Sequence, residues 1–346
     1  MSLGLDGTVR RWKLPQVPRF EGNDSWVVDM DLSRDGSWLA TASQDGRAFI
    51  IDPHNVTKPP VATVPTVPTG SSLRGVLFDP IDPHHIFTLG QSARTPMLWS
   101  WGDHGKIERL KTYDIPPLPT FGYLVSLAIS PDGKTVAGGD TSGTIHLWDA
   151  MTGKLRRDHE EFQGTGQPAD SVAFDPTGQL LAATDSSGVC LWRWGTAKPL
   201  PPLRLPGVTS VTFDPSDPSG HHLVGAAGNG TVRIWTLDGK GKLDYRDLLA
   251  HGYLSSSPSF SKDGRLLAVG TADGLVEVWD VSSGVAVMLD RHHSASVNSV
   301  KFLPGRDRSR LISASDDTTV AQFSCPACAN SDRVIREAVA WEAANP

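Results

Sequence analysis

Two cysteines near the C-terminus have the spacing of a metal or redox motif. Cys325 and Cys328 form a Cys-x-x-Cys pair, and thiolates at this spacing can bind zinc or interconvert with a disulfide. A structural zinc site needs four ligands, but the only other cysteine, Cys190, lies inside a predicted strand. We therefore predict a structural or vestigial role for the pair and no metal.

Two histidine doublets are the next candidates for a metal site. His84-His85 and His221-His222 lie in the enlarged turns "FDPIDPHHIF" and "FDPSDPSGHHLV". Each doublet offers side chains that are neighbours in one loop, whereas a metal site needs ligands that converge from several directions. The doublets predict no metal site.

Residues 128–135, "AISPDGKT", match the pattern of a phosphate-binding loop. Such a loop presents successive backbone N–H groups at the start of a helix, but Pro131 removes one donor and no helix follows. The same stretch coincides with a hairpin turn that recurs along the chain. No Gly-x-Ser-x-Gly elbow is present either, and turns account for the many Asp residues. We predict no catalytic residue and no cofactor.

Composition limits the class of protein. The 346 residues are 39% hydrophobic and 20% charged with a net charge of -6, which is typical of a globular chain with a sizeable core. No Lys/Arg-rich run is present, so nucleic acid and anionic membranes are not predicted partners. The absence of a signal peptide and of an apolar stretch of membrane-spanning length predicts a cytoplasmic protein.

One unit recurs along the chain. The stretch "TADGLVEVWDVSSG" (271–284) reappears, with changes, as "TSGTIHLWDAMTG" (141–153) and "NGTVRIWTLDG" (229–239). The aromatic position of this unit recurs at steps of 39 to 49 residues, as Trp12, Ile51, Trp99, Trp148, Trp192, Trp235, Trp279 and Phe323. Two apolar strands joined by a tight Asp/Pro/Gly turn precede each of the last seven. Each unit therefore predicts one four-stranded sheet.

This unit resembles the repeat of the WD-repeat (Trp-Asp) β-propeller family, from about residue 3 to residue 324. The resemblance implies an all-β fold, a seven-bladed β-propeller of four-stranded antiparallel blades. Propellers of this family close their ring by pairing an N-terminal strand with the last three strands. We expect residues 18–24, "PRFEGND", to supply this strand beside residues 319–324.

In that family a His, a Ser or Thr, the turn Asp and the Trp form a buried hydrogen-bond chain that locks each blade. The residues that match this pattern are His251, Thr271, Asp273 and Trp279 in one blade, and His293, Ser315 and Asp317 in the last. Phe323 replaces the last Trp and cannot donate a hydrogen bond. The other five blades lack the His, so we expect apolar packing to hold them together.

The domain boundaries follow from the repeats. We predict a partial repeat at 1–14, either surplus or a closure strand, a propeller at 15–324 and a tail at 325–346. In the tail, Ser331 is a candidate N-cap before the apolar stripe of a short amphipathic C-terminal helix. This ending is similar to the C-terminus of bacterial multi-domain signal-transduction NTPases with WD-repeat sensor domains. The similarity implies that the chain is the C-terminal portion of a larger signalling or defence protein.

Aromatic residues stand just before several inner strands, where loops surround the mouth of a propeller's channel. Trp26, Phe121, Tyr123 and Tyr253 are therefore candidate partner-binding residues, because exposed aromatics are common interaction hot spots. In the alternative interpretation they fold back and cover the blade ends. The polar stretch "EGNDS" before Trp26 favours exposure of this residue.

Two classes of function remain open. The first is a non-enzymatic scaffold or sensor module that binds a protein or peptide on a propeller face. The second is a propeller hydrolase or lyase with its active site in the channel. An enzyme requires His, Asp and Glu side chains that converge on the channel, and the predicted inner strands, such as "SVAFDP" and "SVTFDP", offer few. The sequence therefore favours the scaffold.

Overall fold

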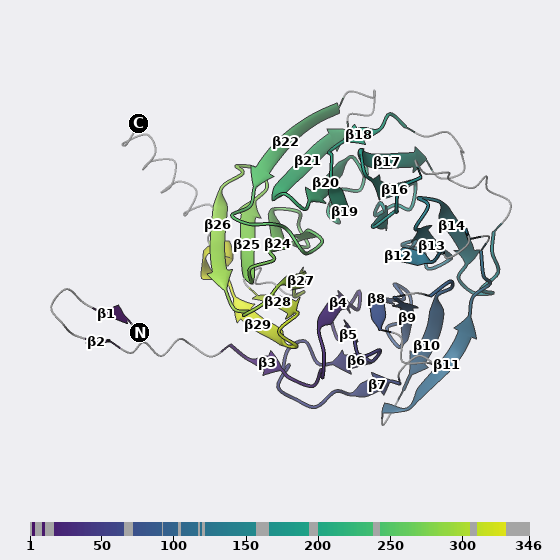
Figure 1. The fold of residues 1–346 in the computed structure, drawn as a ribbon, viewed down its shortest axis with the longest axis horizontal. Helices are drawn as coiled ribbons and strands as arrows, with labels where there is room; N and C mark the ends of the chain where they lie inside the picture. Colours follow the sequence, from purple (N-terminus) through teal and green to yellow (C-terminus); the bar gives the residue numbers. More distant parts are fainter. Residues whose placement is uncertain are drawn as a thin grey trace.

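Seven antiparallel sheets surround a central channel in a closed ring (Figure 1). This computed structural model describes residues 2–3, 9–10, 17–65, 72–91, 93–102, 105–116, 118–119, 122–156, 166–193, 200–237, 243–304 and 310–329. The arrangement is a seven-bladed β-propeller, which confirms the predicted fold class and blade number.

The strands of the first four blades follow the chain order from the channel to the rim. Blade 1 contains β4 (Val27–Leu32), β5 (Leu39–Ser43), β6 (Ala48–Ile51) and β7 (Ala62–Val64). Blade 2 contains β8 (Leu73–Phe78), β9 (His85–Gly90), β10 (Met97–Trp101) and β11 (Ile107–Thr112). Blade 3 contains β12 (Leu124–Ile129), β13 (Thr135–Asp140) and β14 (Ile145–Asp149). Blade 4 contains β15 (Val172–Phe174), β16 (Leu180–Asp185), β17 (Gly188–Arg193) and β18 (Leu203–Arg204).

The remaining three blades complete the ring. Blade 5 contains β19 (Val208–Phe213), β20 (His222–Ala227), β21 (Thr231–Leu237) and β22 (Leu243–Leu249). Blade 6 contains β23 (Ser259–Phe260), β24 (Leu266–Gly270), β25 (Leu275–Asp280) and β26 (Ala286–Arg291). Blade 7 contains β27 (Val297–Phe302), β28 (Arg310–Ser315), β29 (Val320–Ser324) and β3 (Arg19–Phe20).

Blade 3 departs from the predicted four strands. Among the described residues its sheet has three strands, and a single bridge between Trp148 and Leu155 takes the place of the outer strand. The other six blades have four strands each, as predicted.

A short strand from the N-terminal side closes the ring. In β3, Arg19 and Phe20 pair with Ala321 and Val320 of β29. The buried Phe20 ring also packs edge-on against Phe49 of blade 1, at 5.5 Å between ring centroids. This pairing confirms the predicted closure by residues 18–24.

A Ser-x-Asp-Gly turn joins the first two strands of several blades. Between β12 and β13, Ser130 Oγ donates to Asp132 Oδ1 at 2.6 Å and accepts the Thr135 N–H at 3.0 Å. Gly133 adopts the positive φ of 68° that the turn requires. The turns beginning at Ser33 and Ser261 repeat these bonds. The stretch "AISPDGKT" is therefore a hairpin turn, as predicted.

Apolar side chains fill the spaces between neighbouring sheets. The middle strands β5, β13 and β16 are buried along their whole length, because each packs against a sheet on both faces. Between blades 5 and 6, for example, Ile234 and Leu248 share one cluster with Phe260 and Trp279. The core is thus a ring of similar interfaces that surrounds the channel.

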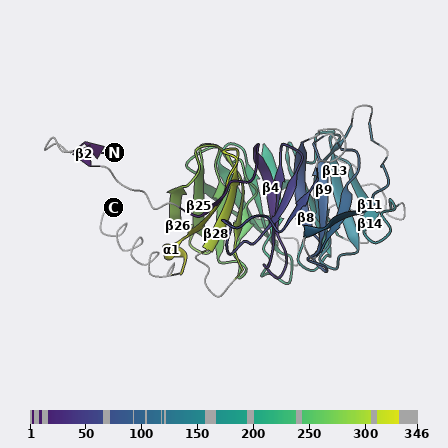
Figure 2. The ribbon, with the colours of Figure 1, turned by 90° about the horizontal axis from the view of Figure 1, so that it is seen from below.

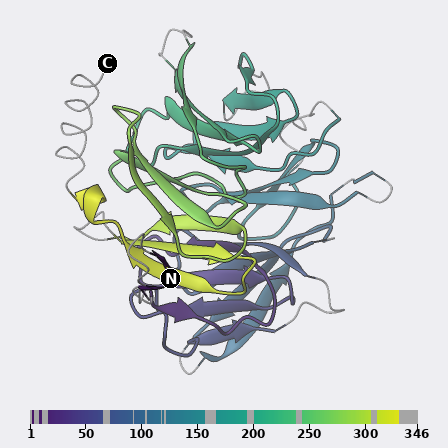
Figure 3. The ribbon, with the colours of Figure 1, turned by 60° about the vertical axis from the view of Figure 1, so that its left-hand side comes forward.

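Two features lie at the ends of the chain. β1 (Ser2–Leu3) and β2 (Val9–Arg10) pair with each other in a sheet of their own (Figure 2). The predicted boundary at residue 14 and the predicted helix after Ser331 fall outside the described residues. α1 (Pro326–Ala329) is a four-residue helix at the rim, beside β26 (Figure 3).

Candidate functional site

Three of the predicted aromatic residues occupy the same position in different blades. The carbonyl groups of Trp26, Tyr123 and Tyr253 accept hydrogen bonds from Gln44, Thr141 and Ala272, at 2.9, 3.1 and 2.8 Å. In each blade the donor lies in the turn between the second and third strands. The three aromatics therefore lie on one face of the ring, the face at which the inner strands begin.

Their exposure differs. The exposed fraction is 49% for Trp26 and 73% for Tyr253, whereas Tyr123 is half-buried. Phe121 lies outside the described residues. Because blades 1, 3 and 6 are not neighbours, the aromatics are distributed around the rim and do not form one cluster. Trp26 and Tyr253 remain the stronger candidates for contact with a partner.

The channel has a more polar wall than the sequence predicted. A cavity of about 630 Å³ runs between the inner strands of all seven blades, and four charged residues, Asp29, Arg74, Asp170 and Lys301, are among those that line it. Arg74 Nε donates to the Val125 carbonyl at 2.7 Å, and its guanidinium lies 4.0 Å from Asp170. Sequence reasoning missed these residues because it attributed the Asp residues to turns.

Serines occupy five of the seven positions at one level of the channel wall. The residue three positions before the last residue of each inner strand faces the channel at this level. These residues are Asp29, Gly75, Ser126, Ser171, Ser210, Ser257 and Ser299. We call them the hydroxyl level. A serine at this spacing in successive repeats is the sequence signal that could have revealed it.

Some residues of the hydroxyl level connect one blade to the next. Asp29 Oδ2 accepts the Val76 N–H of blade 2 at 3.1 Å, and Ser171 Oγ accepts the Val211 N–H of blade 5 at 3.2 Å. Val76 and Val211 follow Gly75 and Ser210 in the sequence. The backbone groups along one edge of an inner strand have no strand partner, and these side chains accept hydrogen bonds from some of the N–H groups there.

Burial changes the titration of two carboxylates on the inner strand β4. Burial raises the pKa of Asp29 to about 6, against the opposing effects of Lys301 and of the Val76 N–H. Burial likewise raises the pKa of Asp31, whose carboxylate lies 3.9 Å from Lys301 Nζ. Both Asp29 oxygens accept backbone N–H groups, from Met30 and Val76. The contacts of Asp29 are therefore those of a structural connection between blades.

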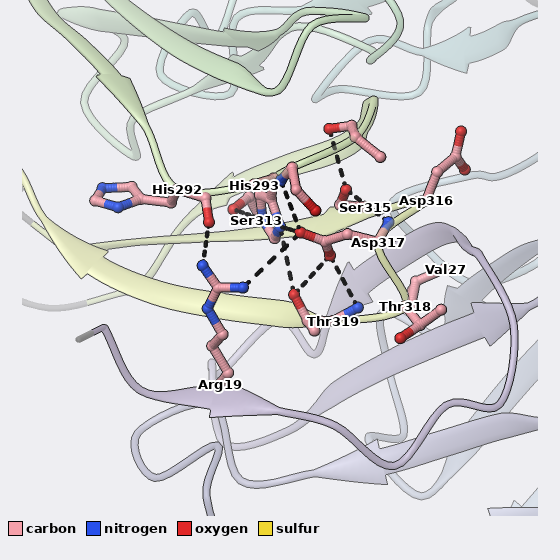
Figure 4. A network of polar contacts seen from close by, with 12 residues as sticks. Arg19, Val27, His292, His293, Ser313, Ser315, Asp316, Asp317, Thr318 and Thr319 are labelled. Atoms are coloured by element: carbon pink, nitrogen blue, oxygen red, sulfur yellow. Dashed lines mark hydrogen bonds and ion pairs between the residues drawn. The ribbon is translucent and has the colours of Figure 1, made fainter. Parts of the chain in front are cut away.

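The predicted lock of the last blade forms, with a different serine (Figure 4). Hydrogen bonds join His293 Nδ1 to Asp317 Oδ2 at 2.9 Å and His293 Nε2 to Ser313 Oγ at 2.7 Å. Ser315, the predicted member, instead donates to the Ala295 carbonyl. The hydroxyl group of the lock thus belongs to the middle of β28 and not to its end.

The closure strand is tied to this lock. The Arg19 guanidinium lies 3.9 Å from Asp317 and also donates to the His292 carbonyl (Figure 4). Thr319 donates to Asp317 through its hydroxyl group and its N–H, at 2.7 and 3.1 Å. Burial alone would raise the pKa of the Asp317 carboxyl, but hydrogen bonds from His293 and Thr319 outweigh it and hold the pKa well below its usual range.

The complete lock predicted for blade 6 does not form. His251, whose side chain is 58% exposed, pairs with Glu277 at 3.1 Å instead of Asp273. Asp273 accepts from Thr271 and Arg291, and Trp279 is buried. Blade 6 differs from blade 7 at two paired positions: Val269 replaces Ser313 and has no hydroxyl group, and Glu277 replaces Ala321 and offers His251 another carboxylate. Residue types that match the family pattern at the turn were therefore not sufficient to form the lock.

The same middle-strand position explains an unpaired hydroxyl group in blade 1. In blade 2, Thr88 Oγ1 accepts the Trp99 indole N–H at 2.9 Å. In blade 1 Thr41 fills the position of Thr88 and Ile51 that of Trp99, so no indole N–H is present and the buried Thr41 Oγ1 has no hydrogen-bond partner.

Replacing Thr41 by the isosteric valine should therefore stabilise the protein. Thr41→Val removes a buried hydroxyl group that makes no hydrogen bond, so we expect the free energy of unfolding in urea to rise by about 1 kcal/mol. Thr88→Val is the matched control and should lower it by about 1 kcal/mol, because the Trp99 indole loses its acceptor. A loss of stability in both variants would contradict the assignment.

The remaining sequence candidates have structural environments. Cys325 and Cys328 form a disulfide and are buried in the cluster between blades 6 and 7. Within the described segments, no group of three or more His, Cys, Asp or Glu side chains is arranged to hold a metal ion. Helices in the described part of the chain fall well short of the length and apolarity that a bilayer crossing requires.

Comparison with known families gives one broad match. The family model described as "WD domain, G-beta repeat" matches residues 14–52, 117–149, 203–236, 246–280 and 285–324, more than half of the chain. The matched segments lie largely in blades 1, 3, 5, 6 and 7. Blades 2 and 4 fall mainly between them, and the structure shows that they have the same architecture.

Individual proteins are similar over different parts of their length. WD repeat-containing protein SL1-17 of Schistosoma mansoni is 32% identical over 170 residues, which are 48% of this chain and 53% of that protein. Guanine nucleotide-binding protein subunit beta-5b of Danio rerio is 24% identical over 317 residues, 87% of this chain and 73% of its own. Small ribosomal subunit protein RACK1y of Oryza sativa subsp. japonica is 27% identical over 165 residues, 46% of this chain and 47% of its own. The chain thus spans about half the length of the first and third relatives.

Proposed function

The chain belongs to the WD40 family of G-beta repeat proteins, and from that membership we propose that it is a non-enzymatic interaction scaffold. It binds a protein or peptide on the face at which the inner strands begin. The observation that carries this proposal is the shared position of Trp26, Tyr123 and Tyr253 on that face, with Trp26 and Tyr253 exposed. Aromatic side chains supply a large contact area at low entropic cost.

The names of the relatives support a role in assemblies. Two of them are named as a subunit of a guanine nucleotide-binding protein and as a protein of the small ribosomal subunit. We further propose that the protein is a signalling scaffold in the cytoplasm. We propose neither nucleic acid nor a membrane as its partner. The resemblance of the tail to bacterial signal-transduction NTPases supports the further proposal that the chain is the C-terminal portion of such a protein.

Asp29 is the observation that favours the alternative, a channel hydrolase or lyase. A carboxyl whose pKa is raised to about 6 can act as a general base near neutral pH. Its two oxygens already accept backbone N–H groups, however, and the described residues that line the channel include no histidine. The scaffold therefore accounts better for the channel.

Removing the exposed aromatics should weaken partner binding. In the double variant Trp26→Ala/Tyr253→Ala, we expect at least tenfold less partner captured from native lysate, equivalent to about 1.4 kcal/mol of binding free energy. The melting temperature should change little, because both side chains are solvent-exposed. Capture would be measured by quantitative mass spectrometry on immobilised wild type and variant.

Tyr245→Ala/Leu249→Ala is the matched control. These residues lie on the outer strand β22 and are 57% and 73% exposed, so the variant removes similar area away from the proposed face. Capture should match that of wild type. Equal capture by all three proteins would place the binding site elsewhere.

A further inference from the structure

Trp26 lies at the seam between blades 7 and 1, where hydrogen bonds connect it to a turn of each blade. In blade 1, the Trp26 carbonyl accepts the Gln44 N–H at 2.9 Å. In blade 7, the Asn298 amide nitrogen donates to the Val27 carbonyl at 2.9 Å and to Asp316 Oδ1 at 2.6 Å. One nitrogen atom therefore holds the Asp316 carboxylate beside the residue that follows Trp26 (Figure 4).

Turn chemistry does not account for Asp316. A turn Asp accepts backbone N–H groups of its own turn, as Asp45 does from Arg47 at 2.9 Å and Asp317 does from Thr319 at 3.1 Å. Asp316 stands one position earlier, and the same position in blades 1, 3, 5 and 6 is filled by uncharged residues, Gln44, Thr141, Gly228 and Ala272. Asp316 therefore adds a negative charge that the turn does not need.

Negative charge exceeds positive charge around Trp26. We call residues 23–27, 43–47 and 316–318 the acidic seam, and they contain four carboxylates and one arginine. That arginine, Arg47, pairs with both Asp24 and Asp45. Arg19 approaches Asp317 from the closure strand, at 3.9 Å. With both arginines counted, two carboxylates remain in excess.

The other two aromatic positions of this face carry no such excess. Beside Tyr253, the Asp273 carboxylate pairs with Arg291 at 2.7 Å. Beside Tyr123, the turn residues 141–144 are uncharged. A positively charged group is therefore attracted to Trp26 in preference to the other two aromatics.

The turn that carries Asp316 also has a costly backbone conformation. Thr318 has a φ of 71°, whereas the same position in blades 1, 3, 5 and 6 is glycine, at Gly46, Gly143, Gly230 and Gly274. A β-branched residue in the left-handed region is strained, and strain of this kind occurs mainly at functional sites. The sequence of this turn thus favours something other than stability.

The chain itself shows how an exposed aromatic and a carboxylate hold a cation. On blade 5, the Arg233 guanidinium lies 4.1 Å from the centroid of the Tyr245 ring, and both Asp247 oxygens accept from it at 2.6 Å. At the acidic seam, the guanidinium of Arg47 lies over the Phe49 ring, at 5.2 Å. The exposed Trp26 ring is thus accessible to a cation from outside the chain.

We propose that the acidic seam binds a cationic side chain, an Arg or Lys of the bound protein. The indole face attracts a cation through its ring electrons, and the excess carboxylates complement the charge. Trp26 is 49% exposed and the Asp24 side chain 80%, so a partner can reach both. This inference rests on the proposed function and deepens it, because it gives the partner a basic residue that contacts blades 7 and 1.

Probes that differ in charge test the proposal, by saturation-transfer NMR on the full chain. The probes are the N-acetyl N′-methylamides of arginine and citrulline, and of lysine and Nε-acetyl-lysine, so that each pair compares a charged side chain with a neutral one. We expect the charged probe of each pair to have a dissociation constant at least about threefold lower, and this advantage to shrink as salt is added. Equal dissociation constants within both pairs, or no transfer to the charged probes, would overturn the proposal.

Variants then locate the contact. Trp26→Ala and Asp316→Asn should each raise the dissociation constant of the arginine probe at least about threefold. Asn at position 316 keeps a side-chain oxygen that can accept from Asn298, so the urea midpoint should stay that of wild type and loss of folding cannot explain the result.

The matched controls change an aromatic and a carboxylate that already hold an arginine of this chain. Tyr245→Ala and Asp273→Asn should bind the arginine probe as wild type does, because Arg233 and Arg291 occupy these positions. An equal loss in the controls and in the two seam variants would show only a general attraction of cations to an acidic protein, and would overturn the site.

The outcomes are separable from those of the capture experiment. Unchanged capture by Trp26→Ala/Tyr253→Ala would overturn the proposed binding face, while a probe affinity that depends on Trp26 and Asp316 would still support the cation site. An arginine-probe affinity that Trp26→Ala and Asp316→Asn do not change would overturn the cation site, whatever the capture experiment shows.

Discussion

Asp317→Ala should lower the free energy of unfolding by about 3 kcal/mol. The Asp317 side chain is 6% exposed and that of His293 is fully buried, so removing the carboxylate leaves His293 Nδ1 and Thr319 without their acceptor. It also leaves Arg19 of the closure strand without its counter-charge. Urea denaturation followed by far-UV circular dichroism would measure the loss.

The control is the corresponding turn residue of blade 6. Asp273 is 51% exposed and pairs with the exposed Arg291, so Asp273→Ala should change stability by no more than about 1 kcal/mol. Equal losses in the two variants would show that the lock of blade 7 contributes nothing beyond an ordinary turn.

The contribution of Asp317 should depend on pH in a defined direction. Its native pKa lies below the ordinary value of 3.8, so the folded state holds the ionised form more strongly than the unfolded state does. The contribution is therefore fully present above the unfolded value and is lost as the pH falls through the lower native pKa. The stability difference between wild type and Asp317→Ala should accordingly shrink below about pH 4.

Gly225→Ala should lower the free energy of unfolding by about 2 kcal/mol. A Cβ atom at Gly225 would lie 2.7 Å from the buried Trp235 ring and 3.2 Å from a Val208 methyl group. Neither neighbour can move without disturbing the packed seam, and overpacking of this kind is destabilising. Chemical denaturation would measure the change.

Gly228→Ala is the matched control, three residues further along the same hairpin. A Cβ atom there meets nothing within 4 Å, and the backbone is outside the left-handed region. We expect a change within about 0.5 kcal/mol, because the added methyl group only restricts the unfolded chain. A destabilisation equal to that of Gly225→Ala would show that backbone freedom, and not contact with Trp235, is the cause.

The fold could be predicted because its signals are local and repeated. Strand alternation, a tight turn that contains Asp, Pro or Gly and a step near 44 residues together specify one blade, and seven copies specify the ring. Even Phe20, in the closure strand, could be placed by counting the strands of the last blade. The short inner strand β23 and the three strands that the described residues of blade 3 form could not, because the repeat pattern continues through both.

The candidate site was only partly predictable. The position of Trp26, Tyr123 and Tyr253 relative to the inner strands follows from the repeat register, but their exposure depends on loops that the register does not specify. The prediction of the blade lock was wrong in blade 6 because it was inferred from His251 and Asp273, whereas Val269 and Glu277 on the neighbouring strands change the partners available to His251.

By itself, the sequence determined the blade number, the order of the strands and the turn chemistry, since these depend on residues close together in the chain. Only the tertiary structure decided which groups meet between blades. Arg19 reaches Asp317 because the ring closes, and the buried Ser210 hydroxyl group has no hydrogen-bond partner. Such contacts join residues that no local pattern relates, and in a buried site one missing N–H leaves a polar group without the partner it needs.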